Sequence, residues 1–392
     1  MIEEALMKPR RVAVIGDLRD SRTAEEFLKI AERVSGFPGA RIIDLAGKVT
    51  GSERSVERLE RETDLGIVSI GPERLARYAR VISGRCRLVV LLGSAPPAVL
   101  RKIRNFVGPS SAGVINSRAG LRATAGNLPP SGSVCLISRG RNVTLRILRR
   151  MALCSVGVGL AVCTGKGEGI KETEILRVAA ADREISVVCL STAGMRDLLE
   201  EVAKVSARKP LLFHPLGEAD KLVISAVRQK GGIFCRSIRE LVCGAKILSE
   251  APPLTGRRLL VLAQAEDLCL EAGKHLAGFE TCELPEKEVK QARLRRLGAG
   301  YCFEDSEVLR KRLGGLLASA DGCLLIFRED EKEENVARLV GGVRPVKTLA
   351  VVHPGRWRPG RFPVFDDPED AATALRISRE RGELERRLSR PE

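Results

Sequence analysis

The chain of 392 residues begins the same local pattern three times. Each time, basic or Pro/Gly-rich residues run into a short apolar strand, in the segments KPRRVAVIG (8–16), LPPSGSVCLIS (128–138) and APPLTGRRLLVLA (251–263). After each start, apolar strands alternate with charged helical patterns. Strands and helices that alternate with short connections form right-handed parallel β-α-β units. The pattern therefore predicts an α/β protein of three consecutive doubly wound domains.

Five strands are expected in each third. They are residues 12–15, 41–45, 65–70, 88–92 and 113–115; then 134–138, 157–163, 185–190, 210–214 and 232–235; then 259–263, 279–283, 299–303, 322–327 and 348–352. The two Pro-rich stretches, near 128–132 and 251–256, are the natural linkers. The predicted domains are residues 1–127, 128–252 and 253–392.

The composition agrees with parallel sheets in a reducing compartment. Hydrophobic residues make up 44% of the chain and aromatic residues only 3%, so the cores are aliphatic, as in sheets buried on both faces. No two of the eleven cysteines have Cys-x-x-Cys spacing, and several lie in apolar strands, so we expect no bound metal and no disulfides. The N-terminus lacks an apolar core, and the longest apolar run (151–163) is too short and glycine-rich to span a bilayer. We expect a soluble cytoplasmic protein without a membrane partner.

The net charge of +16 favours an anionic partner. However, the 66 basic residues are mixed with 50 acidic ones, and no basic tract is interleaved with aromatic residues. Nucleic acid binding is therefore kept as an alternative, one that predicts a steep loss of binding with rising salt.

Ligands of open parallel sheets lie at the carboxyl ends of the strands. The loop after the first strand lacks a Gly-x-Gly-x-x-Gly fingerprint. The loop after the strand at 134–138 predicts a phosphate site in which helix N–H groups and two arginines face an anion, formed by Ser138, Arg139, Gly140, Arg141 and Asn142. A capped helix with exposed arginines explains the same residues equally well. The loop after the strand at 259–263, AQAEDL, carries two carboxylates and is not expected to hold phosphate.

The order of these parts resembles the ADP-forming acyl-CoA synthetases, whose α part is akin to the α subunit of succinyl-CoA synthetase. The resemblance covers nearly the whole chain and is carried by VAVIGD (12–17), GPSSAGVINSRAGLRATAGNLPPSGSVCLISRGRNVTL (108–145), EEVAKVSARKPLLF (200–213), GGIFCRSIRELVCGAKILSEAPPLTGRRLLVL (231–262) and FPVFDDPEDAATAL (362–375). It implies a Rossmann-like coenzyme A domain followed by two flavodoxin-like ligase domains. It also implies a nucleotide-grasping β-like part, on the same or another chain, that supplies a phosphoryl group.

The resemblance places coenzyme A, or an acyl-CoA, at the strand ends of the first domain. The implied binding residues are Gly16, Asp17, Gly71, Pro72, Gly108, Pro109, Ser110 and Ser111. In the family the turn is usually Gly-Pro-Asn-Cys, so two serines replace Asn and Cys here. Basic residues near these strand ends are candidates to meet the phosphates of the cofactor, namely Arg11, Arg19, Arg22 and Arg74.

The family's phosphorylated histidine has no counterpart in this sequence. In the family it lies between the strand matching KPLLF and the helix before GGIFC, and a glutamate after the strand matching ISVVCL orients it. Here the first connection is short, and the second reads STAG with Ser191 and Thr192. His214 at a strand end is a weak candidate for a relocated phosphate carrier, and His275 and His353 match no family site.

Two functions remain open. One is a catalytically degenerate α-like protein that binds coenzyme A, an acyl-CoA, a β-like subunit or a second copy of itself. A protein can keep its fold after its catalytic residues have changed. The other is an active acid–CoA ligase whose phosphate carrier is relocated or supplied by a partner.

Overall fold

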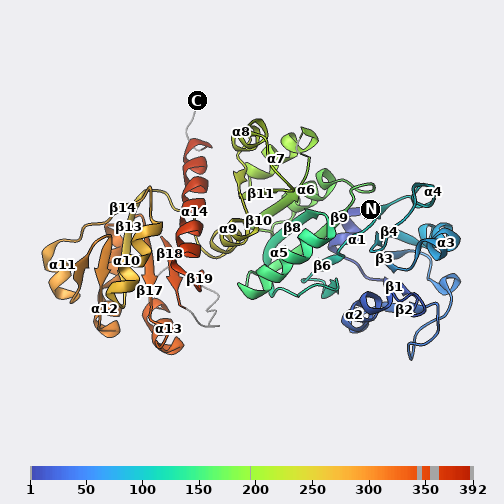
Figure 1. The fold of residues 1–392 in the computed structure, drawn as a ribbon, viewed down its shortest axis with the longest axis horizontal. Coiled ribbons are helices and arrows are strands. Elements are labelled where there is room, and N and C mark those ends of the chain that lie inside the picture. Colours follow the sequence, from blue (N-terminus) through green and yellow to red (C-terminus); the bar gives the residue numbers. More distant parts are fainter. Residues whose placement is uncertain (1, 195, 342–346, 354–361, 389–392) are drawn as a thin grey trace. The chain divides into compact units, whose positions relative to one another are not determined.

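The computed structural model describes residues 2–194, 196–341, 347–353 and 362–388. The chain divides into two compact units, Met1–Phe234 with two sheets and Cys235–Glu392 with a third. All three sheets are flanked by helices and are mostly parallel, which confirms the predicted α/β class (Figure 1).

The first sheet is entirely parallel. Its strands lie in the order β2 (Ala40–Asp44), β1 (Val12–Gly16), β3 (Thr63–Ser69), β4 (Cys86–Leu91) and β5 (Phe106–Val107). One face packs on α1 (Ile2–Met7) and α2 (Ala24–Ser35), and the other on the 3-10 helix η1 (Val56–Arg58), α3 (Pro72–Arg85) and α4 (Pro97–Leu100). The strands are nearly continuous apolar runs because both faces are buried.

The second sheet has the order β12 (Ile233–Phe234), β11 (Leu211–Pro215), β10 (Val187–Thr192), β8 (Ser131–Arg139), β9 (Val158–Gly165), β6 (Val114–Asn116) and β7 (Leu121–Ala123). One face packs on α6 (Glu172–Ala181), the 3-10 helix η2 (Arg196–Leu198), α7 (Leu199–Ser206) and α8 (Lys221–Gln229). Helix α5 (Arg141–Leu153) packs on β8 and β9 from the opposite side.

The fifth strand expected in the first third, residues 113–115, belongs to the second sheet instead. As β6 it pairs antiparallel with β9 and, through a hairpin, with β7. Only six residues separate Val107 from Val114. A parallel return to the first sheet needs a crossover of a dozen or more residues, so the chain pairs antiparallel with another sheet.

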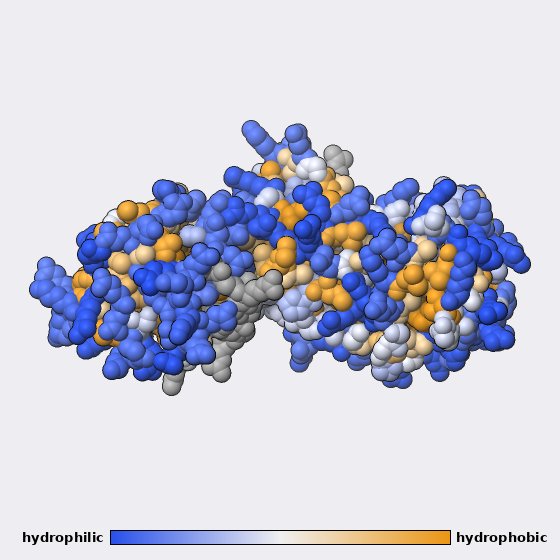
Figure 2. Space-filling view, turned by 60° about the horizontal axis from the view of Figure 1, so that its bottom comes forward, coloured by the Kyte–Doolittle hydropathy of each residue, from blue (hydrophilic) through white to orange (hydrophobic). Residues whose placement is uncertain are grey.

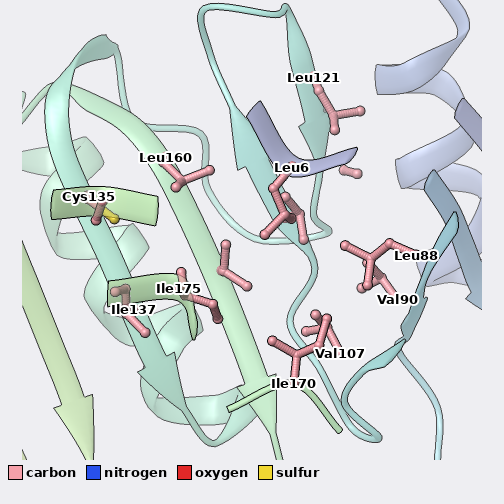
Figure 3. Close-up of a cluster of buried hydrophobic side chains, with 14 of the residues drawn as sticks. Leu6, Leu88, Val90, Val107, Leu121, Cys135, Ile137, Leu160, Ile170 and Ile175 are labelled. Atoms are coloured by element: carbon pink, nitrogen blue, oxygen red, sulfur yellow. The ribbon is translucent and has the colours of Figure 1, made fainter. Parts of the chain in front are cut away.

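The two sheets of the first unit share one apolar core. Figure 3 shows Leu88 and Val90 of β4 near Leu6 of α1 and Val107 of β5, with Leu160 of β9 and Ile175 of α6 in the same cluster. All of these side chains are buried. The cluster therefore joins sheets that the sequence pattern assigned to separate domains.

The third sheet has the order β15 (Arg295–Leu297), β16 (Gly300–Cys302), β13 (Arg258–Ala263), β17 (Gly322–Ile326), β18 (Thr348–Val352) and β19 (Val364–Phe365), with β14 (Glu280–Thr281) also beside β13. Helices α12 (Ser306–Ala318) and α13 (Glu333–Gly341) cover one face. Helices α10 (Glu266–His275) and α14 (Pro368–Leu388) pack together and contact β13 and β18, respectively, and α11 (Glu286–Gln291) precedes β15. The expectation of parallel pairing throughout was wrong for β15, which forms a short antiparallel hairpin with β16.

Helix α9 (Ile238–Glu250) packs along α14 in the second unit. Arg239 donates to Glu369 at 2.7 Å and also to Asp370, at the N-terminal end of α14. These carboxylates raise the pKa of Arg239 although its burial acts to lower it. The domain boundaries after residues 127 and 252 remain predictions.

Charged and polar side chains cover most of the face drawn in Figure 2, with smaller apolar areas between them. No helix in the described part of the chain has both the length and the apolar character needed to cross a bilayer.

Candidate functional site

The carboxyl edge of the first sheet gathers the residues predicted to bind coenzyme A. Gly16 ends β1 and Asp17 follows it, Gly71 and Pro72 lie at the start of α3 shortly after β3, and residues 108–111 follow β5. These strands run parallel, so the three segments lie along one edge. Gly16 also has a packing role, since a Cβ there would lie 2.0 Å from the ring of Phe27.

Asp17 organises two of the four candidate arginines. Its buried carboxylate lies 3.1 Å from Nε of Arg19 and 2.5 Å from Nε of Arg74. Both guanidinium groups are therefore already opposite a carboxylate and are less available to a phosphate.

The other two arginines differ in their surroundings. Arg11 lies 3.5 Å from Glu60. Arg22 is exposed, and no carboxylate partner is found for it among the described residues. Beside it, the hydroxyl of Thr23 is buried at the start of α2 and makes no hydrogen bond within the described chain. Arg22 and Thr23 thus leave a charge and a hydroxyl uncompensated at this edge.

The turn at 108–111 is fixed by both sheets of the first unit, and its Gly108–Pro109 peptide is cis. Ser111 is fully buried; its Oγ donates to the carbonyl of Cys163 at 2.6 Å and accepts from the N–H of Gly113 at 3.0 Å. Ser110 has a positive φ of 58°, and its hydroxyl has no partner among the described residues. Of the two serines that replace Asn and Cys, only Ser110 offers a side chain to a ligand.

The predicted phosphate loop forms the turn from β8 into α5, with Gly140 at a positive φ of 83°. Arg139 does not point to an open anion site. Its Nε and Nη2 donate to the buried carboxylate of Glu172 at 2.7 and 2.8 Å, and Thr164 donates to the same group at 2.7 Å. Burial acts to raise the pKa of Glu172, but these hydrogen bonds outweigh it and lower that pKa.

Arg141 is also committed to the chain itself. It donates to the carbonyl of Ser111 at 2.9 Å, to that of Leu92 at 3.3 Å and to Glu26 at 2.5 Å. Ser138 is buried and Asn142 is exposed. The loop therefore offers an anion its helix N-terminus, while both arginine charges are balanced internally.

The carboxyl edge of the second sheet also holds a serine–histidine pair. Ser191 of β10 and His214 of β11 are register partners, and Oγ of Ser191 lies 3.0 Å from Nδ1 of His214. Burial lowers the pKa of His214, which favours the neutral imidazole. Ser191 thus contacts the histidine from the strand whose end carries the orienting glutamate in the family.

The other two histidines lie in the second unit. His275 is in the last turn of α10, 3.5 Å from Glu271. His353 is buried at the end of β18, where Nε2 lies 2.9 Å from the carbonyl of Glu331. Within the described ranges, no group of three or more His, Cys, Asp or Glu is arranged to hold a metal ion.

Sequence reasoning missed the carboxylates that neutralise the loop. Glu172 lies 33 residues from Arg139, and Glu26 lies 115 residues from Arg141. No local spacing signals such pairs. The contact between Ser191 and His214 had a weak signal, because neighbouring parallel strands place equivalent end residues side by side.

No protein-family profile matches the chain. The acetate–CoA ligase (ADP-forming) of Methanocaldococcus jannaschii is 24% identical over 202 residues, which cover 45% of this chain and 29% of that ligase. The α subunit of acetate–CoA ligase (ADP-forming) II of Pyrococcus furiosus is 21% identical over 329 residues, which cover 73% of this chain and 71% of the subunit. The chain thus spans less than a third of the first relative and most of the second.

Two solved structures share the fold over nearly their whole length. A protein of Pyrococcus horikoshii superposes with a TM-score of 0.84 at 18% identity, covering 97% of this chain and 99% of that one. The apo dinucleotide-forming acetyl-coenzyme A synthetase 1 of Candidatus Korarchaeum cryptofilum gives 0.81 at 15% identity, covering 99% of both chains. The chain is thus similar in sequence to two ADP-forming acetate–CoA ligases, and it shares the α/β fold of the two solved structures.

Proposed function

We propose that this chain is an α-like part of an ADP-forming acyl-CoA synthetase that binds coenzyme A or an acyl-CoA without a phosphohistidine relay. One observation supports the proposed absence of a phosphohistidine relay. The chain has three histidines, and the only one in the unit with the first two sheets, His214, contacts a serine and not a carboxylate. A histidine that accepts and passes on a phosphoryl group needs an orienting partner and access to both reaction sites.

The carboxyl edge of the first sheet is the proposed coenzyme A site. Its support is the gathering of Gly16, Gly71 and the turn at 108–111, together with groups left uncompensated there. Arg22 is suited to a phosphate oxygen, and the hydroxyls of Thr23 and Ser110 are free to donate or accept.

The proposed partner is a nucleotide-grasping β-like subunit, because one relative is named as an α subunit. A homo-oligomer is the other arrangement in keeping with the family. The cytoplasm is the proposed compartment, since none of the eleven cysteines forms a disulfide in the described part of the chain and ten of them are buried.

Calorimetric titration with coenzyme A and acetyl-CoA tests the binding. We expect one site, weakened about tenfold by Arg22→Glu because a phosphate contact becomes a repulsion. The matched control is Arg80→Glu, which makes the same charge change on the exposed side of α3. No heat with either ligand, or equal weakening by both variants, would contradict the proposed site.

The contact between Ser191 and His214 favours a second candidate, an active ligase with a relocated carrier. Ser191 holds Nδ1, and Nε2 has no partner among the described residues. A neutral imidazole with a free nitrogen is the nucleophilic form. Incubation with radiolabelled nucleoside triphosphate and a β-like subunit separates the two candidates. Acid-labile label that is absent from His214→Gln would replace the non-catalytic proposal.

A further inference from the structure

A cavity of about 560 Å³ lies at the amino end of the third sheet, and none of the residues of the proposed coenzyme A site lines it. Arg258 begins β13, Glu280 begins β14, and Asp321 directly precedes β17. The last turns of α14 complete the wall. The lining residues are Gly256, Arg257, Arg258, Glu280, Asp321, Glu383, Arg386 and Arg387.

Two of the three carboxylates in this wall already have cationic partners. Asp321 accepts from the N–H of Arg258 at 2.9 Å and from its Nη2 at 3.4 Å. It lies so close to Gly256 that a Cβ there would be 1.9 Å from a carboxylate oxygen. Glu383 lies 3.6 Å from Nε of Arg379. These pairs balance Asp321, Glu383 and Arg258.

Three guanidinium groups on the wall remain unbalanced. Arg257, Arg386 and Arg387 have no carboxylate partner in the described part of the chain, and Glu280 is the one wall carboxylate without a cation there. The arginines come from two separate elements, the segment before β13 and the end of α14. Basic residues in a last helical turn also offset the helix dipole, which explains Arg386 and Arg387 but not Arg257.

The side-chain types that line the cavity indicate which class of ligand it can bind. The wall carries no aromatic or aliphatic side chain, so it offers no apolar side chain to hold an acyl chain. Several arginine forks in one cavity match the oxygens of linked phosphate groups, because each fork can donate two parallel hydrogen bonds. We propose that this cavity binds an oligophosphate, either as a free anion or as the phosphate tail of a nucleotide.

Calorimetry on the full chain, with tripolyphosphate and with ATP as separate probes in magnesium-free buffer, tests the proposal. We expect both probes to bind, because both carry the linked phosphate groups that the arginines would contact. A triple variant, Arg257→Ser, Arg386→Ser and Arg387→Ser, should weaken both at least about tenfold. If one probe binds more tightly, and the triple variant removes the difference, that probe represents the form of oligophosphate that the cavity prefers, a free anion or a nucleotide.

The matched control changes three exposed arginines in the first unit, Arg80→Ser, Arg101→Ser and Arg104→Ser, which alters the net charge equally. A second variant, Glu280→Gln, should bind both probes more tightly, a gain that misfolding cannot produce. Equal losses in the two triple variants would reduce the effect to overall charge and overturn the proposal. Absence of tripolyphosphate binding to the unmodified chain, or unchanged binding in Glu280→Gln, would also overturn it.

Discussion

Arg141, in the first turn of α5, donates a 2.9 Å hydrogen bond to the carbonyl oxygen of Ser111 in the Gly-Pro turn. The side chain that the sequence offers to a phosphate therefore ties the start of α5 to the end of the first sheet. Its second partner, Glu26, neutralises the charge that an anion would seek.

Replacing Arg141 by alanine should lower the free energy of unfolding by about 2 kcal/mol, because a charged donor to two carbonyls and a carboxylate is removed. Urea denaturation measures this. Arg146→Ala is the control, since Arg146 is exposed on the same helix. Similar losses in both variants would show that the contact with Ser111 adds little.

Glu172→Gln should be more destabilising, by about 3 kcal/mol, because it leaves Arg139 facing a neutral group in a buried network. The double variant with Arg139→Gln should recover part of that loss, since no uncompensated charge remains. Denaturation of the single and double variants, with exposed Glu168→Gln as the control, measures the coupling. A double variant as unstable as the sum of its parts would contradict a paired role.

Asp44 predicts a stability change at acid pH. Its carboxylate accepts from the N–H groups of Leu18 at 3.2 Å, Ala46 at 2.9 Å, Lys48 at 2.6 Å and Val49 at 3.1 Å. Burial acts to raise the pKa of Asp44, but these four donors lower it. Its stabilising effect is therefore complete above the pKa of the unfolded chain, about 3.9, and is lost as pH falls towards the lowered folded value.

Asp44→Asn should consequently flatten the dependence of unfolding free energy on pH between about 5 and 3. Denaturation at a series of pH values measures the slope, and exposed Glu218→Gln is the control. An unchanged slope in Asp44→Asn would show that other carboxylates dominate acid unfolding.

His214 predicts a loss of stability on acidification at higher pH than Asp44 does. Because burial lowers the pKa of His214, the unfolded chain binds a proton that the folded chain resists. Stability should fall as pH drops below the ordinary histidine value of about 6.5. An NMR titration of the imidazole should place its midpoint below that value, and His214→Gln should remove the stability slope from pH 7 to 5. His275→Gln, on α10, is the control.

The sequence predicted most strands of the three sheets because their apolar runs are bounded by glycine, proline and charged residues. It did not place β6, whose partner β9 is determined by the short connection after β5 and not by the strand's own residues. The two-residue strands β5 and β19 were not predicted.

The position of the candidate site could be predicted from the sequence, but whether its arginines are paired with carboxylates could not. The end of β8 and the turn at 108–111 lie at strand carboxyl ends, as the β-α-β pattern requires. Whether Arg139 and Arg141 face a ligand depends on Glu172 and Glu26, which only the folded chain brings near them.

Because the first two sheets share one core, the chain cannot be divided between them into fragments that fold independently. A fragment ending at residue 127 would carry β6 and β7 away from β9, and it would expose the apolar side chains around Val107 and Leu160 to water. Such a fragment would be prone to aggregate through its bare strand edge. The two sheets should therefore unfold together, in a single thermal transition.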